Sequence, residues 1–207
     1  ISQAQRHRGP DGSGVWQSSG QEVVFGHRRL AIIDLSEGGA QPMVEGDSGC
    51  AVTFNGEIYN FLDLRRELAA LGEGFRSSSD TEVVLKAYKR WGIDCVRRFR
   101  GIFALALWDP RARVVHLVRD QMGIKPLYWT TVRDADTGEE VLLFASEVRA
   151  LLASGAVPRR LDPAAVASYL WHGFVVGPGT VVEGVHLLPA ATVLTIESGG
   201  SSPGVDS

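Results

Sequence analysis

An α+β fold with largely antiparallel sheets is predicted by the order in which strand-like and helix-like segments follow one another. Strand-like runs come first, two amphipathic helical patterns follow, and strand-like runs then resume. This order lacks the regular strand–helix alternation of a doubly wound parallel sheet, and the sequence contains no internal repeat. The chain has 207 residues, 44% hydrophobic and 22% charged, which suits one large globular domain with a real core.

Short apolar runs separated by polar turns predict the first strands. The glycine-rich stretch HRGPDGSG, residues 7–14, has the composition of a loop, and a polar turn over 18–20 separates the two strands that follow it. Four strands are expected in this part of the chain, over residues 14–17, 23–27, 30–33 and 50–54.

Apolar side chains at helical spacing predict two consecutive helices. Over residues 60–71, apolar residues recur three and four positions apart, and Gly72 supplies a stop. Over residues 79–91, Ser79 is placed to cap the first turn and Glu82 follows three positions later, which is the pattern of a capping box. The apolar face of the second helix consists of Val83, Val84, Ala87 and Trp91.

The second half of the chain returns to strands and ends in a linker-like composition. Two further helices are expected over 146–152 and 163–171, and residues 185–196 hold two short apolar runs broken at Pro189. We expect one domain over 1–197, and a linker or the start of a connection over 198–207, where SGGSSPG stands. Strands are expected over 102–108, 114–119, 127–131 and 141–145.

Charge and composition exclude several classes of function. The net charge of −3 gives no basic field for nucleic acid, and neither a membrane-spanning run nor a signal-peptide pattern is present. Two cysteines, Cys50 and Cys95, do not make a disulfide framework, which favours a cytoplasmic protein. The five histidines lack metal-ligand spacing, so no metal site is expected, and the sequence contains no P-loop.

The tripeptide Asn55-Gly56-Glu57 follows a predicted strand and combines groups suited to catalysis. An Asn amide offers donors, and Gly lets a backbone N–H approach a ligand closely, which together are the usual construction of an oxyanion hole. The Glu57 carboxylate would hold an ammonium group. The alternative is a plain hairpin turn, because Asn-Gly between apolar runs is the strongest short hairpin signal.

Arg29 and Asp80 would complete a pocket for an α-amino acid. A fixed guanidinium is the natural bidentate partner of a carboxylate, although Arg29 taken in isolation is better explained as a solvated surface residue. Asp80 adds a second acid for an ammonium group, or it is simply a helix-start carboxylate favoured by the macrodipole. Together with the Asn55-Gly56 donors, these groups describe a site that attacks a side-chain carbonyl of an amino acid.

The ordered motifs of the chain resemble a known family. HRGPDGSG, GHRRLAIIDLSEGGAQPM, FNGEIYNFLDLRREL, SSSDTEVVLKAY, RGIFALALWD, RDQMGIKPLYW and FASEVRAL occur in this order. In this they resemble the class II glutamine amidotransferase (glutaminase) domain of glutamine-dependent asparagine synthetase, and the likeness continues more loosely through YLWHGFVVGPGTVVEGVHLLPA.

The resemblance implies a fold and a set of roles. It implies the N-terminal-nucleophile hydrolase fold, a four-layer αββα arrangement of two stacked antiparallel sheets with helices outside. Carried onto this sequence, Arg29 would hold the α-carboxylate of L-glutamine, Asn55 and Gly56 would form the oxyanion hole, and Glu57 and Asp80 would hold the α-amino group.

The resemblance also implies a nucleophile that the sequence does not show. In the family, an N-terminal cysteine attacks the glutamine amide and its own α-amino group serves as base. Here the segment expected to carry it is missing and Ile1 has no nucleophilic side-chain heteroatom, so the fragment itself is expected to be inactive. Cys50 and Cys95 lie in apolar contexts and are expected to be buried structural thiols.

The expected function is the glutaminase half of an ATP-dependent asparagine synthetase. Ammonia would pass to a C-terminal synthetase domain of the same chain, which uses ATP and Mg to activate aspartate, and a homodimer is compatible with this interpretation. The SGG of 198–200 lies five residues from Asp206-Ser207, so no ATP site is assigned within the 207 residues. Two alternatives stay open: a related amidotransferase with another acceptor, and a non-catalytic scaffold domain.

Overall fold

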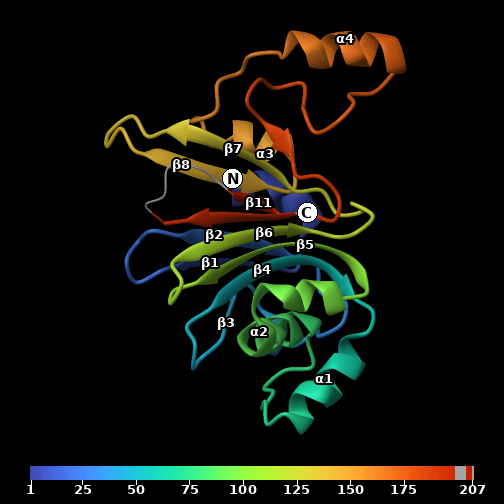
Figure 1. Ribbon diagram of the computed structural model, residues 1–207. Helices are drawn as coiled ribbons and strands as arrows, with labels where there is room; N and C mark the ends of the chain where they lie inside the picture. Colours follow the sequence, from blue (N-terminus) through green and yellow to red (C-terminus); the bar gives the residue numbers. More distant parts are fainter. Residues whose placement is uncertain (199–203, 207) are drawn as a thin grey trace.

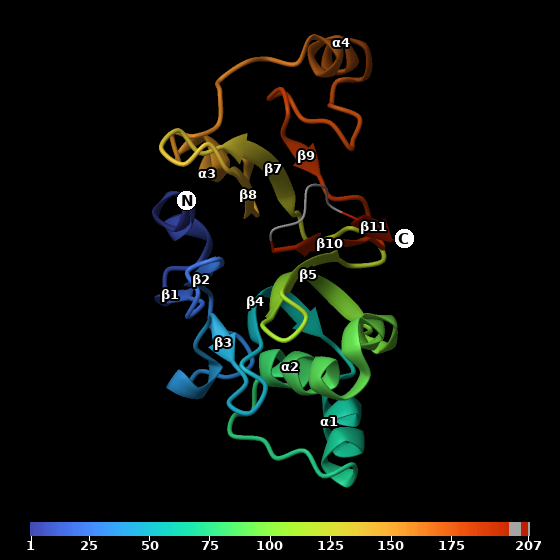
Figure 2. The ribbon, with the colours of Figure 1, turned by 60° about the vertical axis from the view of Figure 1, so that its left-hand side comes forward.

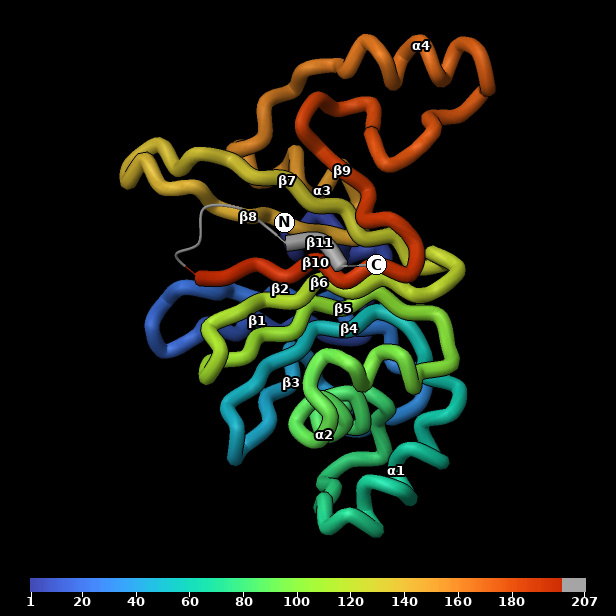
Figure 3. Tube along the Cα trace, viewed as in Figure 1, coloured from blue at the N-terminus to red at the C-terminus, as the bar shows by residue number. Residues whose placement is uncertain are grey.

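A six-stranded antiparallel sheet forms the centre of the molecule (Figure 1). The computed structural model of the protein describes residues 1–198 and 204–206. Figure 3 shows how the chain crosses this sheet, with the late strand β10 added beside β6. In spatial order, its strands are β11 (Gly204–Asp206), β10 (Val193–Glu197), β6 (Val114–Arg119), β5 (Gly101–Asp109), β4 (Ala51–Ile58) and β3 (Met43–Val44).

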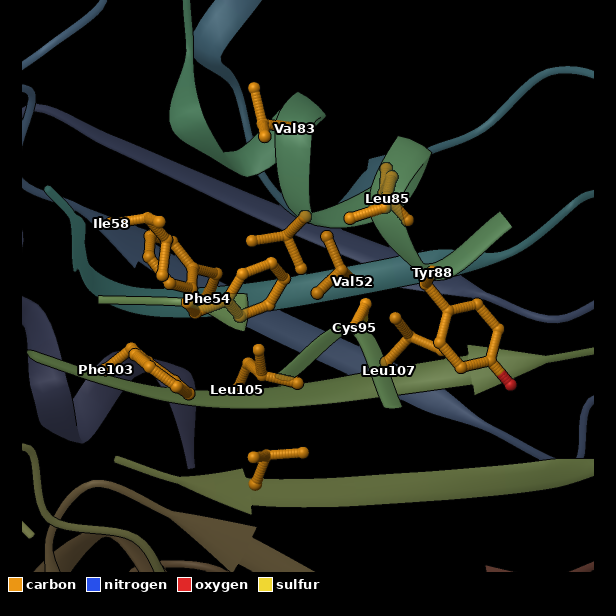
Figure 4. Close-up of a cluster of buried hydrophobic side chains, with 14 of the residues drawn as sticks. Val52, Phe54, Ile58, Val83, Leu85, Tyr88, Cys95, Phe103, Leu105 and Leu107 are labelled. Atoms are coloured by element: carbon orange, nitrogen blue, oxygen red, sulfur yellow. The ribbon is translucent and has the colours of Figure 1, made fainter. Parts of the chain in front are cut away.

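Helices α1 (Phe61–Ala70) and α2 (Asp80–Trp91) cover one face of this sheet. The amphipathic spacing expected from the sequence places apolar side chains of both helices against the strands, where burial stabilises the fold. Ser79 caps α2, because its hydroxyl accepts a hydrogen bond from the Thr81 N–H at 3.1 Å. Figure 4 shows the resulting cluster, whose buried strand residues include Val52, Phe54, Phe103, Leu105 and Leu107.

The opposite face of the six-stranded sheet packs against a layer made of two smaller antiparallel sheets. Buried side chains such as Phe25 and Leu127 fill the space between the layers. The two-stranded sheet pairs β1 (Gly12–Gln17) with β2 (Val24–Arg29), and the three-stranded sheet has the order β8 (Glu140–Ala145), β7 (Tyr128–Arg133) and β9 (His186–Leu187).

The outer surface of this second layer is covered by short helical segments. The 3-10 helix η1 (Ser2–Arg8) and helix α3 (Val148–Leu152) lie there, and their apolar residues join strands β7 and β8 in a third cluster. The order of layers is therefore helix, sheet, sheet, helix, and every described strand pair is antiparallel. The predicted α+β fold with αββα layering is confirmed.

Helix α4 (Pro163–His172) stands away from these layers, as both Figure 1 and Figure 2 show. The carboxylate of Asp162 accepts the N–H groups of Ala164 and Ala165, and Gly173 ends the helix in the left-handed conformation. Ala165 is its one buried residue, whereas Leu170 and Trp171 are 79% and 85% exposed. The helix is thus fixed by its caps rather than by burial of an apolar face.

Three local expectations differ from the structure. Residues 30–33 form no strand, because this apolar run has no partner strand and lies along a cavity instead. Glu82 does not close a capping box; its carboxylate accepts the N–H groups of Arg76 and Ser77 at 2.8 and 2.7 Å. Two further 3-10 helices, η2 (Glu37–Gly39) and η3 (Gly92–Arg98), also form.

The C-terminal segment expected as a linker is described in part. Gly204–Asp206 forms β11 and pairs with β10, while residues 199–203 and 207, including most of the SGG stretch, lie outside the described residues. Within the described residues, no helix combines the length and the apolar character needed to cross a bilayer.

Candidate active site

A cavity of about 700 Å³ lies between the two sheet layers. Its walls come from strands β2, β4, β5 and β8, from the loop that follows β2, and from the first residues of α2. Small residues make room for it: Ala104 and Ala106 of β5 face this side, while the alternate large residues Phe103 and Leu105 face the helices. All five residues predicted for the site line this one cavity: Arg29, Asn55, Gly56, Glu57 and Asp80.

Asn55, Gly56 and Glu57 lie inside strand β4 rather than after its end. The ladder with β5 continues through Asn55–Ala104 and Gly56–Phe103 to Ile58–Gly101, so the expected strand end at residue 54 is wrong. The same ladder excludes the hairpin alternative. Local sequence favoured a turn, but pairing with a strand more than forty residues away keeps the backbone extended.

Gly56 has a packing role in addition to its predicted one. Its φ of +154° is unfavourable for residues with a side chain, and a Cβ added there would overlap the Ile102 carbonyl and Phe103. Strand β5 therefore approaches β4 closely at this point because residue 56 has no side chain. The neighbouring amide of Asn55 and carboxylate of Glu57 are held beside the cavity on a rigid strand.

Asp80 and Glu57 place two carboxyl groups at the same part of the cavity. Asp80 is 4% exposed, and its Oδ2 accepts the Ile58 N–H at 3.1 Å. Burial raises the pKa of Asp80, and the negative charge of Glu57 raises it further. In the described part of the chain neither carboxyl forms an ion pair. Two acidic groups without a cationic partner suit a ligand ammonium group.

Arg29 ends strand β2 and holds the loop that follows. Its Nη1 donates to the Ser36 carbonyl at 2.9 Å and its Nη2 donates to the Asp34 carbonyl. The Asp34 carboxylate in turn accepts Ser36 Oγ at 2.6 Å and Ser78 Oγ at 3.0 Å, and these hydrogen bonds lower the pKa of Asp34 to about 2. The loop is thereby fastened to the segment before α2.

His27 links two of the layers beside the site. Its Nδ1 lies 3.0 Å from Thr53 Oγ1, so the hydrogen bond joins β2 to β4. Burial first, and then the positive charge of Arg29, lower the pKa of His27 to about 4, so the imidazole is neutral at physiological pH.

The two cysteines lie on the opposite face of the six-stranded sheet. Cys50 is followed on its face by Val52 and Phe54 in the cluster beneath α1 and α2, whereas the cavity is lined by the alternate residues Thr53 and Asn55. Both thiols are free and buried; burial raises the pKa of Cys50, and it raises that of Cys95 to about 12. The expectation of buried structural thiols is confirmed.

Sequence patterns alone missed Asp34 and Gln41. Asp34 carried a weak local signal, since Asp followed two residues later by Ser36 is typical of an Asx-turn, and Asp34 Oδ1 accepts the Ser36 N–H at 2.8 Å. Gln41 carried none, because its partners lie 13 and 40 residues further along the chain.

Two solved structures share this fold. The glutamine phosphoribosylpyrophosphate amidotransferase of B. subtilis aligns over 98% of this chain and 44% of its own, with a TM-score of 0.64 and 20% identity. A structure described as the allosteric regulatory enzyme of purine biosynthesis aligns over 87% of this chain and 34% of its own, with a TM-score of 0.59. The fold is that of the N-terminal-nucleophile amidotransferases.

Sequence comparison identifies the family. The glutamine amidotransferase domain model matches residues 1–205, and the chain belongs to this family. It is 40% identical over 197 residues to asparagine synthetase [glutamine-hydrolyzing] 3 of Bacillus subtilis. The aligned part covers 93% of this chain and 30% of that protein. A putative asparagine synthetase [glutamine-hydrolyzing] 2 of Methanocaldococcus jannaschii is 33% identical over 208 residues, covering 92% of this chain and 39% of that protein.

A third relative has a different name. Amidase chry2 of Gibberella zeae is 40% identical over 154 residues, which cover 73% of this chain and 22% of that protein. The chain therefore spans between about a fifth and two fifths of the lengths of these relatives.

Proposed function

We propose that this domain hydrolyses L-glutamine and supplies the released ammonia to a synthetase part of the same protein. The observation that carries the proposal is the convergence of Arg29, Asn55, Gly56, Glu57 and Asp80 on one cavity from three separate segments. These groups are complementary to the carboxylate, the side-chain carbonyl and the ammonium group of a free amino acid.

Each end of the substrate has its own wall in this proposal. Glu57 and Asp80 hold the α-ammonium group, and the charge of the bound ammonium offsets the cost of ionising Asp80 in a buried place. Arg29 holds the α-carboxylate. Its guanidinium lies where the loop after β2 begins, and it also donates hydrogen bonds to the Ser36 and Asp34 carbonyls of that loop. Asn55 and the Gly56 N–H stabilise the oxyanion that forms when the side-chain amide is attacked.

The nucleophile, in this proposal, is a cysteine outside the 207 residues. Cys50 and Cys95 face the helices, so neither is placed to attack a ligand between the sheets. Strands β2 and β8 both line the cavity, and within the described residues each pairs on one side only, with β1 and β7 respectively. In this proposal, a further extended segment pairs with one of these free edges and brings a residue into the cavity.

The chemistry follows the family resemblance. A cysteine thiolate attacks the amide carbon of glutamine, and the carbonyl electrons move to the oxygen that Asn55 and Gly56 stabilise. The tetrahedral species expels ammonia once its nitrogen is protonated, which leaves a thioester, and water then releases glutamate and the thiol. The residues of this chain bind the substrate and stabilise the oxyanion in both steps.

The synthetase reaction lies, in this proposal, in the part of the protein that aligns with the rest of the longer relatives. There, ATP and Mg²⁺ would activate aspartate for amidation. The cavity described here does not fit a triphosphate, because Glu57 and Asp80 would repel it, and no hydrolytic step involves ATP. We place the enzyme in the cytoplasm, which the two free thiols support.

A second candidate is an amidotransferase with another ammonia acceptor. This candidate is kept because one relative is named an amidase rather than an asparagine synthetase. The two candidates share the same glutaminase chemistry and differ only in the product made from the ammonia.

The test is an assay of the full-length protein. We expect release of glutamate from L-glutamine, and formation of asparagine when aspartate, ATP and Mg²⁺ are added. Glutamate release without asparagine would favour another acceptor. A full-length protein that makes asparagine from added ammonia but releases no glutamate would favour the scaffold alternative and overturn the proposal.

A further inference from the structure

The side-chain amide of Gln41 joins two parts of the cavity wall. Its Oε1 accepts the Phe54 N–H at 2.7 Å, and its Nε2 donates to the Phe54 carbonyl at 3.0 Å. The same Nε2 lies 3.3 Å from Thr81 Oγ1 at the start of α2. One amide therefore contacts strand β4 and helix α2 at the same time.

The geometry explains why a side chain occupies this place. Strand β3 pairs with β4 through Met43–Val52 and Val44–Ala51, and extending this register would place residue 41 opposite Phe54. Strand β3 begins only at Met43, so residue 41 does not belong to it. The Gln41 amide, which has one acceptor and N–H donors like a peptide group, takes the place of the missing backbone partner.

The two residues that Gln41 contacts are neighbours of the proposed binding groups. Phe54 directly precedes Asn55, and Thr81 directly follows Asp80. Asn55 acts at the side-chain carbonyl of the substrate, whereas Asp80 acts at its α-ammonium group. The distance between these two groups has to match the length of the amino acid. Gln41 joins the backbone of Phe54 to the side chain of Thr81, and it adds to the direct contact between the Asp80 carboxylate and the Ile58 N–H of β4.

We propose that Gln41 is a positioning residue that sets the spacing between Asn55 and Asp80, and thereby selects L-glutamine over the shorter L-asparagine. The inference rests on the proposed glutaminase function. L-asparagine carries the same carboxylate, ammonium and amide groups, but it has one methylene fewer between them. A wall with fixed spacing rejects it because its amide cannot reach the oxyanion donors while its ammonium group is bound.

The experiment uses the full-length protein with three variants. Gln41→Met keeps the size of the side chain and removes all of its hydrogen bonds, and Gln41→Glu places an oxygen against the Phe54 carbonyl. The matched control is Gln121→Met, because Gln121 Nε2 also donates to a backbone carbonyl, that of Phe99 at 3.3 Å, but lies outside the cavity. Turnover of both amino acids and the melting temperature are measured for each.

We expect both Gln41 variants to lose about 10²-fold in kcat/KM for L-glutamine, because a shift of the binding groups by roughly 1 Å has that effect. The preference for L-glutamine over L-asparagine should fall in the same variants, while Gln121→Met keeps both values. Wild-type kcat/KM and selectivity in a folded Gln41→Met protein would overturn the inference. A lowered melting temperature with unchanged kinetics would overturn it too, since a merely structural residue behaves in that way.

A second readout separates this inference from the proposed function. Binding of L-glutamine raises the melting temperature of a protein that binds it, without any need for turnover. If the wild type binds glutamine in this assay but does not hydrolyse it, the hydrolytic function fails, and a smaller shift in Gln41→Met still supports the positioning role. A wild type that neither binds nor hydrolyses glutamine contradicts both.

Discussion

The two walls of the glutamine cavity are built differently. The wall that carries Asn55 and Asp80 belongs to β4 and the start of α2, and it is held by the β5 ladder and by Gln41. A second wall is the loop over residues 30–40, whose apolar side chains are largely exposed. This loop is held by Arg29 and by the hydrogen bonds of the Asp34 carboxylate to Ser36 and Ser78. Strand pairing presets the first wall, whereas the second depends in part on Arg29, which is also the proposed ligand of the substrate carboxylate.

Because of this difference, the kinetic effect of a substitution has a different cause on each of the two walls. On the β4 wall, removing a functional group leaves the backbone in place, so the kinetic effect reports chemistry. On the loop wall, removing Arg29 deletes a proposed substrate contact and also frees the carbonyls of Asp34 and Ser36. The four predictions below test the contrast in the full-length protein.

The largest effect is expected for Asn55→Ala on the rigid wall. Loss of one oxyanion donor should lower kcat by about 10²–10³-fold with little change in KM, because the donor acts mainly in the transition state. Steady-state kinetics on L-glutamine measure this. Asn60→Ala is the matched control, since Asn60 binds backbone groups of Arg98 and Arg100 away from the cavity. An unchanged kcat in Asn55→Ala would remove Asn55 from the mechanism.

A smaller effect, mainly on KM, is expected for Arg29→Ala on the loop wall. Losing charge-assisted hydrogen bonds to the α-carboxylate should raise KM by about 10–10²-fold. Asp34→Ala sharpens the comparison, because it breaks the contacts to Ser36 and Ser78 but removes no proposed substrate ligand. Equal KM values for the two variants would show that Arg29 acts only by holding the loop.

The smallest kinetic effect is expected for Asp80→Asn. KM should rise by about 10-fold, at the low end for a charged hydrogen bond, because Glu57 still holds the ammonium group. The variant should be at least as stable as the wild type at pH 7, since Asn keeps an acceptor for the Ile58 N–H and removes a buried charge.

The pH dependence of stability tests the same carboxyl. Its pKa is raised in the folded protein, so ionised Asp80 destabilises the fold above that pKa, and the cost disappears as the pH falls below its usual value of 3.8. The stability advantage of Asp80→Asn should therefore shrink on acidification, as followed by thermal melts. The exposed Asp136→Asn is the control. A growing advantage at low pH would contradict the assignment.

Local sequence predicted most elements because their signals are local. The apolar spacing of α2 and its Ser79 cap lie within one segment, and the break at Pro189 lies within another. Local sequence gave the wrong prediction in two places: a strand over residues 30–33, and the end of a strand before Asn55-Gly56. Both outcomes depend on a partner strand. An apolar run becomes a strand only when such a partner is available, and an Asn-Gly pair stays extended only when a neighbouring strand pairs with it.

The sequence predicted which residues line the site, but it did not predict the hydrogen bonds that hold them in place. Arg29, Asn55, Gly56, Glu57 and Asp80 were chosen for the chemistry of their groups and from the family motifs, and they do line one cavity. The contact of Asp34 with Ser78 and the bridging amide of Gln41 were not foreseen, because their partners are distant in the sequence.

The sequence by itself determined which groups are available and where the chain becomes helical or extended, since periodicity and capping act over a few residues. Only the tertiary structure decided that β4 runs on through Glu57, that the cysteines face the helices, and that Gln41 joins Phe54 to Thr81. These outcomes depend on strand pairing and layer packing between segments far apart in the chain. No local preference encodes those pairings.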